Sequence, residues 1–171
     1  MWRIKEFIVS VKNLIRWFPI IWKDRDWDTN FIWDIFKFKI ENQAKYIGYH
    51  DRHLSAKRDA EIMMLCVRLM EKIRNEYYQA EYQKYSESEI VFSPSSKEGY
   101  SEINIVEKHE NYDEYFKKYP RIYKQVMESK KNRFHTDRKV GIALNIAHIN
   151  HDRARKLLFT LMERNIEGWW D

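Results

Sequence analysis

The segment from residue 22 to residue 28, WKDRDWD, combines three carboxylates, two cations and two indoles within seven residues. Two kinds of chemistry suit this composition. In the first, Trp22 or Trp27 stacks on a ring while Lys23 or Arg25 holds an anion, as rings and phosphates require. In the second, the aspartates cap the following helix, because carboxylates accept hydrogen bonds from its free N–H groups. The segment predicts either a ligand site or a helix start.

A second candidate is the stretch 117–139, which contains nine basic residues and only two acids. The cations are interleaved with aromatic residues, and this mixture suits phosphates next to bases, in a nucleotide or in single-stranded nucleic acid. The alternative is a solvated basic face that pairs with the acidic stretch before it. The ligand-binding residues predicted here are Tyr119, Arg121, Tyr123, Lys124 and Arg133.

Two histidine pairs have the spacing of metal ligands, His50 with His53 and His148 with His151. On a helix, residues i and i+3 share a face, so both pairs together would supply four imidazoles to one metal. The His-Asp dipeptides resemble those of helical HD-type phosphohydrolases, but no histidine precedes the first pair. A histidine on an apolar helix face is more often a hydrogen-bonded core residue. We therefore predict no metal or other cofactor and keep the histidines as an alternative.

Composition excludes several classes of protein. The chain has 171 residues and four glycines, none of them in a GxGxxG, GxxxxGK or GxSxG motif. This excludes glycine-loop nucleotide-binding folds and α/β hydrolases. Cys66 is the single cysteine, so no disulfide can form within the chain. No apolar run reaches the roughly 20 residues of a membrane-spanning helix. We expect an intracellular, soluble protein without a membrane span.

Apolar residues at helical spacing predict a mainly α fold, in which residues 1–171 form a single-domain bundle of about five helices. Residues rich in β-branched side chains predict a small β-hairpin or a mobile loop near 89–106. The expected helices cover 2–18, ended by Pro19; 32–47, ended by Gly48; 55–85; 112–123, divided near Pro120; and 140–162, ending near Gly168.

The first expected helix has an apolar stripe, and its basic residues lie largely off that stripe. The stripe contains Ile4, Phe7, Ile8, Val11, Leu14, Ile15 and Phe18. A basic amphipathic helix would also suit an anionic membrane surface. Because most such stripes pack on a core, we expect this one to be buried.

Tryptophans are concentrated at the two ends of the chain. Trp2, Trp17, Trp22, Trp27 and Trp33 lie at one end, and Trp169 and Trp170 at the other. Neither group has many local partners to cover it, and burying a large aromatic side chain contributes about 1.5 to 3 kcal/mol. We therefore expect the two groups to cover each other.

The WKDRDWD segment and the C-terminal stretch 165–171, NIEGWWD, resemble a group of small, uncharacterised phage-encoded proteins. The resemblance covers both ends of the chain, and no functional residue is carried over from it. It implies a bacteriophage protein that acts in the host cytoplasm. Small phage proteins are often virion accessories or inhibitors of host defence, and some of these inhibitors sequester nucleotide signals.

These observations predict a non-enzymatic binding protein that holds an anionic nucleotide-like ligand or nucleic acid. Its predicted biological role is to sequester a host defence signal. Homo-oligomerisation is compatible with the charge pattern. One alternative is a structural or protein-binding phage accessory protein, in which the same residues make subunit contacts. The other is a metal-dependent phosphohydrolase that uses the four histidines and Asp152.

Overall fold

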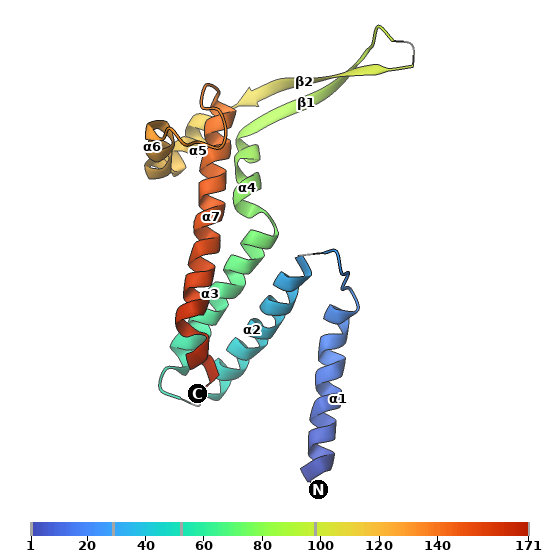
Figure 1. The fold of residues 1–171 in the computed structure, drawn as a ribbon, viewed down its shortest axis with the longest axis vertical. Coiled ribbons are helices and arrows are strands. Elements are labelled where there is room, and N and C mark those ends of the chain that lie inside the picture. The colour runs from blue at the N-terminus through green and yellow to red at the C-terminus, as the bar shows by residue number, and fades with distance from the viewer. Residues whose placement is uncertain (1, 29, 52, 98, 171) are drawn as a thin grey trace. The chain divides into compact units, whose positions relative to one another are not determined.

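The computed structural model of the protein describes residues 2–28, 30–51, 53–97 and 99–170. The fold is mainly α-helical with one small antiparallel β-hairpin, as the sequence predicts (Figure 1). The α-helices are α1 (Trp2–Ile21), α2 (Asn30–His50), α3 (Ala56–Arg74), α4 (Tyr77–Ala80), α5 (Tyr112–Lys118), α6 (Pro120–Glu128) and α7 (Lys139–Asn165). The strands are β1 (Ser86–Pro94) and β2 (Ser101–Glu110), and two short 3₁₀ helices are η1 (Glu81–Tyr85) and η2 (Glu167–Trp170).

The chain divides into two compact units. The first contains Met1–Arg74 together with Thr160–Asp171, and the second contains Asn75–Phe159. By sequence, α7 contributes its last residues to the first unit and its remainder to the second. That the whole chain is a single domain stays a prediction.

In the first unit, α2 and α3 form a helical hairpin (Figure 1). Gly48 allows the two helices to approach closely, since a Cβ atom at this position would lie 3.2 Å from the Cβ of Ala60. Two ion pairs join the same helices, Asp34 with Arg74 and Lys37 with Glu71. The buried apolar side chains of this hairpin include Ile40, Ala44 and Ile47 of α2 and Met63, Cys66, Val67, Met70 and Ile73 of α3.

Three predicted helix ends are wrong. α1 continues past Pro19 to Ile21, because a proline in the last turn removes one N–H and leaves the others to bond. α2 continues past Gly48 and ends at His50, where the next residue, Asp51, has a left-handed φ of 47°. The third helix does not run to residue 85. It ends at Arg74, and a left-handed Glu76, with φ 49°, precedes the short helices α4 and η1.

The apolar stripe of α1 is exposed, so our expectation that it is buried is wrong. Its seven side chains are between 37% and 69% exposed. The contact of α1 with α2 comes from another side of the helix, where the Trp17 ring packs edge-on against Phe38 with a centroid distance of 4.8 Å. Helical periodicity identifies an apolar face, but another element must lie over that face for it to be buried.

The second unit has an aromatic core that joins α5 and α6 to the first half of α7. The loop between α6 and α7 is held by buried Asn145, whose side-chain oxygen accepts from the N–H groups of Arg133 and Phe134. The Asn145 amide donates to the carbonyls of Phe134 and Gly141. The buried members of the core are Tyr112, Tyr115, Phe116, Ile122, Val126, Ile142, Ala143 and Ile146.

The predicted β-hairpin is present and begins three residues earlier than expected. β1 and β2 form a long two-stranded ribbon (Figure 1). Ile90 pairs with Ile105 and Phe92 pairs with Ile103, so these four side chains share one face, because side chains alternate along a strand. All four are exposed.

Candidate functional site

The predicted site at residues 22–28 is the connection from α1 to α2. Trp22 and Trp27 are 70% and 82% exposed, so neither indole is held in a cleft. The Asp28 carboxylate accepts a hydrogen bond of 2.9 Å from the Asn30 N–H, which confirms the helix-start interpretation for this aspartate. The guanidinium of Arg25 donates to the neighbouring carbonyl of Asp24.

Lys23 lines a small cavity between α2 and the end of α1. The side chains of Asp34, Glu41, Lys37 and Arg74 line the same cavity, so its charges are mixed, and Arg74 is already paired with Asp34. Segment 22–28 therefore serves as a connection and a helix start, and its cations and indoles do not converge on one cavity.

The two tyrosines predicted in the basic stretch are packed within the second unit. The hydroxyl of Tyr119 donates a 2.6 Å hydrogen bond to buried Glu81, and Lys118 pairs with the same carboxylate. Burial and this hydrogen bond both raise the pKa of the Tyr119 phenol. The ring of Tyr123 stacks on Phe116 with a centroid distance of 5.0 Å. Both rings are half-buried and support the core.

The three predicted cations of this stretch have different surroundings. Arg121 is exposed on α6, and the exposed ammonium of Lys124 lies 3.8 Å from Glu128 one turn later. Arg133 lies over the Phe134 ring at 5.6 Å, and its guanidinium is 3.3 Å from Nδ1 of His148. The predicted residues of segment 22–28 thus belong to the first unit, and those of stretch 117–139 belong to the second.

Three of the four histidines have a protein partner, whereas the buried Nδ1 of His151 has no hydrogen-bond partner among the described residues. The ring of His50 packs on Tyr46, and Nε2 of His53 donates to Asp59 at 3.0 Å. Nε2 of His148 lies 3.4 Å from Asp152, and burial lowers the pKa of His151. Within the described ranges, no group of three or more His, Cys, Asp or Glu side chains could hold a metal ion.

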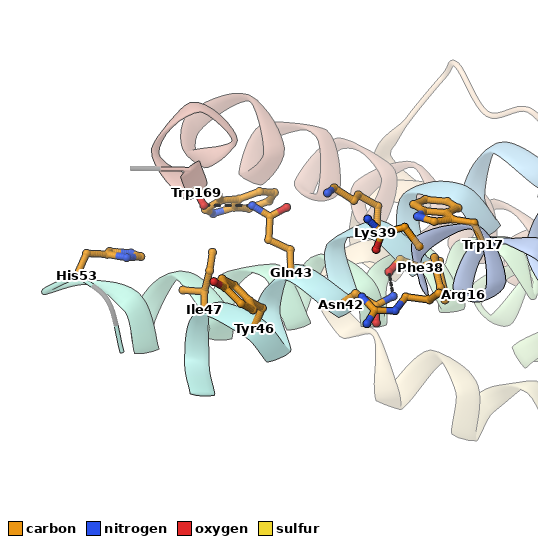
Figure 2. Close-up of a pocket in the computed structure, with 11 residues that line it drawn as sticks. Arg16, Trp17, Phe38, Lys39, Asn42, Gln43, Tyr46, Ile47, His53 and Trp169 are labelled. Atoms are coloured by element: carbon orange, nitrogen blue, oxygen red, sulfur yellow. Dashed lines mark hydrogen bonds between the residues drawn. The ribbon is translucent and has the colours of Figure 1, made fainter. Parts of the chain in front are cut away.

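The first unit contains a cavity of about 580 Å³ that combines aromatic rings with cations (Figure 2). Trp169 lies over Gln43 at one end of the cavity, and Trp17 lies with Phe38 at the other (Figure 2). Its lining residues are Asn13, Arg16, Trp17, Phe38, Lys39, Asn42, Gln43, Tyr46, Ile47, His53 and Trp169. We call this the aromatic–basic cavity.

Helical spacing explains why these residues meet. On α1, the residues Asn13, Arg16 and Trp17 are three and four positions apart and therefore share a face. On α2, the lining side chains recur every four residues along two adjacent rows. One row is Phe38, Asn42 and Tyr46, and the other is Lys39, Gln43 and Ile47. The short helix η2 supplies Trp169 from the far end of the chain.

Hydrogen bonds hold two of the amide side chains in place. Gln43 donates to the carbonyl of Trp169 at 3.1 Å, which attaches η2 to α2. Asn42 donates to the carbonyl of Phe38 at 2.7 Å. The indole N–H of Trp169 is buried and makes no hydrogen bond with any residue that the structure describes. Buried donors are normally paired, so this N–H is an exception in the packing of η2.

The aromatic–basic cavity has a positive electrostatic character. Arg16 and Lys39 line it, and no Asp or Glu is among its lining residues in the described chain. Behind it, the hydroxyl of Ser55 and then His53 lower the pKa of Asp59, so this carboxylate stays ionised and accepts from Nε2 of His53. The cavity therefore favours an anion that carries an apolar or aromatic portion.

The sequence contained one signal that pointed to this cavity. We expected the two tryptophan-rich ends to cover each other, and Trp17 and Trp169 do line the same cavity. Exposed Trp22 and Trp27 do not follow that expectation, and the side chains of Trp2 and Trp170 lie outside the described residues. The other lining residues were missed because they are scattered among ordinary helix-surface positions.

Comparison with known proteins identified no relative: no family model, no curated protein and no solved structure matches the chain. The function is therefore inferred from the chemistry of the aromatic–basic cavity.

Proposed function

We propose that the protein is a non-enzymatic binding protein that holds an anionic, ring-containing ligand of the nucleotide class in the aromatic–basic cavity. The observation that carries this proposal is the meeting of four aromatic rings and two permanent cations around one space of about 580 Å³. Ligand sites of this kind are concave, largely apolar and contain a few placed polar groups.

The lining residues suggest how such a ligand would be held. Trp17, which is half-buried, offers an indole on which a base stacks, and Arg16 can make two parallel hydrogen bonds to a phosphate. Arg16 forms no ion pair with any described residue, so its guanidinium is not already neutralised.

A binding role agrees with the state of the single thiol. Cys66 is fully buried in α3, and burial raises its pKa to about 11, so it stays protonated and is not a nucleophile at neutral pH. The cavity itself gathers groups that recognise a ligand, namely rings, cations and amides.

The biological setting of this proposal comes from the resemblance to phage-encoded proteins. In the host cytoplasm, a phage protein with such a cavity would sequester a nucleotide that signals infection. Cyclic and linear nucleotides of the kind used in defence signalling are therefore the first ligands to test.

Isothermal titration calorimetry with a panel of linear and cyclic nucleotides and short oligonucleotides tests the proposal. We expect binding by at least one nucleotide, and we expect Arg16→Ala to weaken it roughly tenfold or more, because a lost charge-assisted hydrogen bond costs about 1.5 to 3 kcal/mol. Lys12→Ala is the matched control, since it removes the same charge from the same helix but Lys12 does not line the cavity. Absence of binding across the panel, or equal weakening by both variants, would refute the proposal.

A further inference from the structure

The apolar stripe of α1 faces away from the aromatic–basic cavity. At about 100° per residue, the stripe from Ile4 to Phe18 occupies an arc of roughly 120°. Asn13, Arg16 and Trp17, which line the cavity, lie on the opposite side of the same helix. One helix therefore has two different faces, one that lines the cavity and one that is apolar and exposed.

An exposed patch of this kind marks an interaction surface. Exposure of a single apolar side chain is ordinary, but here seven that share one helical face are all exposed. The patch is also aromatic, since Phe7 and Phe18 belong to it and the exposed indole of Trp22 packs against Phe18 with a centroid distance of 5.2 Å. Indoles prefer the boundary between water and a lipid bilayer.

The charge of α1 indicates what covers this face. The helix has four basic residues, Arg3, Lys5, Lys12 and Arg16, and a single acid, Glu6. Lys5 and Lys12 are seven positions apart, so they lie along one border of the stripe. Pairing the stripes of two copies would bring like charges together, whereas an anionic lipid surface would attract them.

None of the described helices is apolar over a length that would let it cross a bilayer. A helix with a basic polar face and an apolar, aromatic opposite face instead lies in the plane of the interface. We propose that α1 docks through its apolar stripe on the surface of an anionic membrane, with Lys5 and Lys12 at the headgroups. This proposal is independent of the ligand in the aromatic–basic cavity, because the two use opposite faces of α1.

Vesicle flotation with the full-length protein tests this proposal. We expect the protein to float with phosphatidylglycerol-containing vesicles, to float much less with phosphatidylcholine vesicles, and to dissociate as salt is added. Leu14→Glu should lower the bound fraction at least about tenfold, because it places a charge within the apolar stripe. Ser10→Glu is the matched control, since it adds the same charge to an exposed position off the stripe.

Two further measurements keep the proposal falsifiable. Circular dichroism should show unchanged helicity and melting for Leu14→Glu, since Leu14 is exposed in the folded protein. Lys5→Gln combined with Lys12→Gln should remove the preference for anionic vesicles. Failure of the wild-type protein to bind either vesicle, or equal losses for Leu14→Glu and Ser10→Glu, would overturn the proposal. Light scattering that shows a dimer dissociated by Leu14→Glu would also overturn it, because a second copy would then cover the stripe.

Discussion

Helices α1 and α3 belong to the same unit, have nearly the same length and each have an apolar stripe, yet their stripes have opposite surroundings. On α3, Met63, Cys66 and Met70 are at most 1% exposed. On α1, Phe7 and Leu14 are both 69% exposed. The same kind of pattern thus builds a core in one helix and a free surface in the other.

The partners of each helix explain the difference. α3 packs on α2 through its apolar face, and ion pairs at Asp34–Arg74 and Lys37–Glu71 flank that contact. α1 meets α2 through Trp17, on a different side from its stripe. Burial therefore depends on which face of a helix meets its neighbour, and periodicity alone does not specify this.

The largest expected contrast between the two helices is in stability. Met70→Ala should lower the free energy of unfolding by about 2 to 5 kcal/mol, because it leaves a cavity in a packed core. Leu14→Ala should change it by less than about 0.5 kcal/mol, because the side chain is already in water. Urea denaturation of both variants measures the difference. A cost for Leu14→Ala close to that for Met70→Ala would mean that the α1 stripe is covered in solution.

The rate of thiol modification compares the solvent exposure of the α1 and α3 stripes within one protein. In Leu14→Cys, the new thiol should react with a maleimide about 100-fold faster than Cys66, because Cys66 is buried and its raised pKa, about 11, keeps it protonated at pH 8. The reaction should show one fast and one slow phase, each of one thiol. In denaturant the two phases should merge. A single fast phase without denaturant would show that α3 opens readily.

The smallest contrast concerns charged residues on the two helices. Arg74 donates a hydrogen bond of 2.9 Å to Oδ2 of Asp34, and its Nε lies 2.9 Å from Oδ1, so this two-point contact is at the upper end of surface ion pairs. Arg74→Ala should lower stability by about 0.5 to 1 kcal/mol, and less in high salt. Lys12→Ala should have no measurable effect. Thermal melts at low and high salt test this prediction. Equal losses of stability in Arg74→Ala and Lys12→Ala would show that the ion pair does not stabilise the protein.

Most of the fold could be predicted from the sequence because its signals are local. The spacing of apolar residues predicted α1, α2, α3 and α7, and β-branched residues on either side of a turn predicted the hairpin. The predicted helix ends are wrong at residues whose usual effect on a helix does not apply at that position. Pro19 lies in the last turn of α1, where a helix tolerates proline. Gly48 allows close packing inside α2 and does not end this helix. Glu76 has a left-handed backbone conformation, which a glutamate does not predict.

The candidate site could be predicted much less well. The predicted residues were chosen because rings and cations are adjacent in the sequence, but neighbours on a helix point in different directions. Tyr119 and Tyr123 thus turn into the core while Arg121 and Lys124 turn to water. The cavity instead uses residues spaced by four on α2, together with one indole from the end of the chain.

The sequence by itself determined the helical fold class and the apolar face of each long helix, because these depend on residue order within a single element. The tertiary structure decided which faces meet. It brought Trp169 to Gln43, turned Arg16 and Trp17 toward α2 and left the α1 stripe exposed. Contacts between distant segments depend on how whole elements pack, and that information is spread over many residues at once.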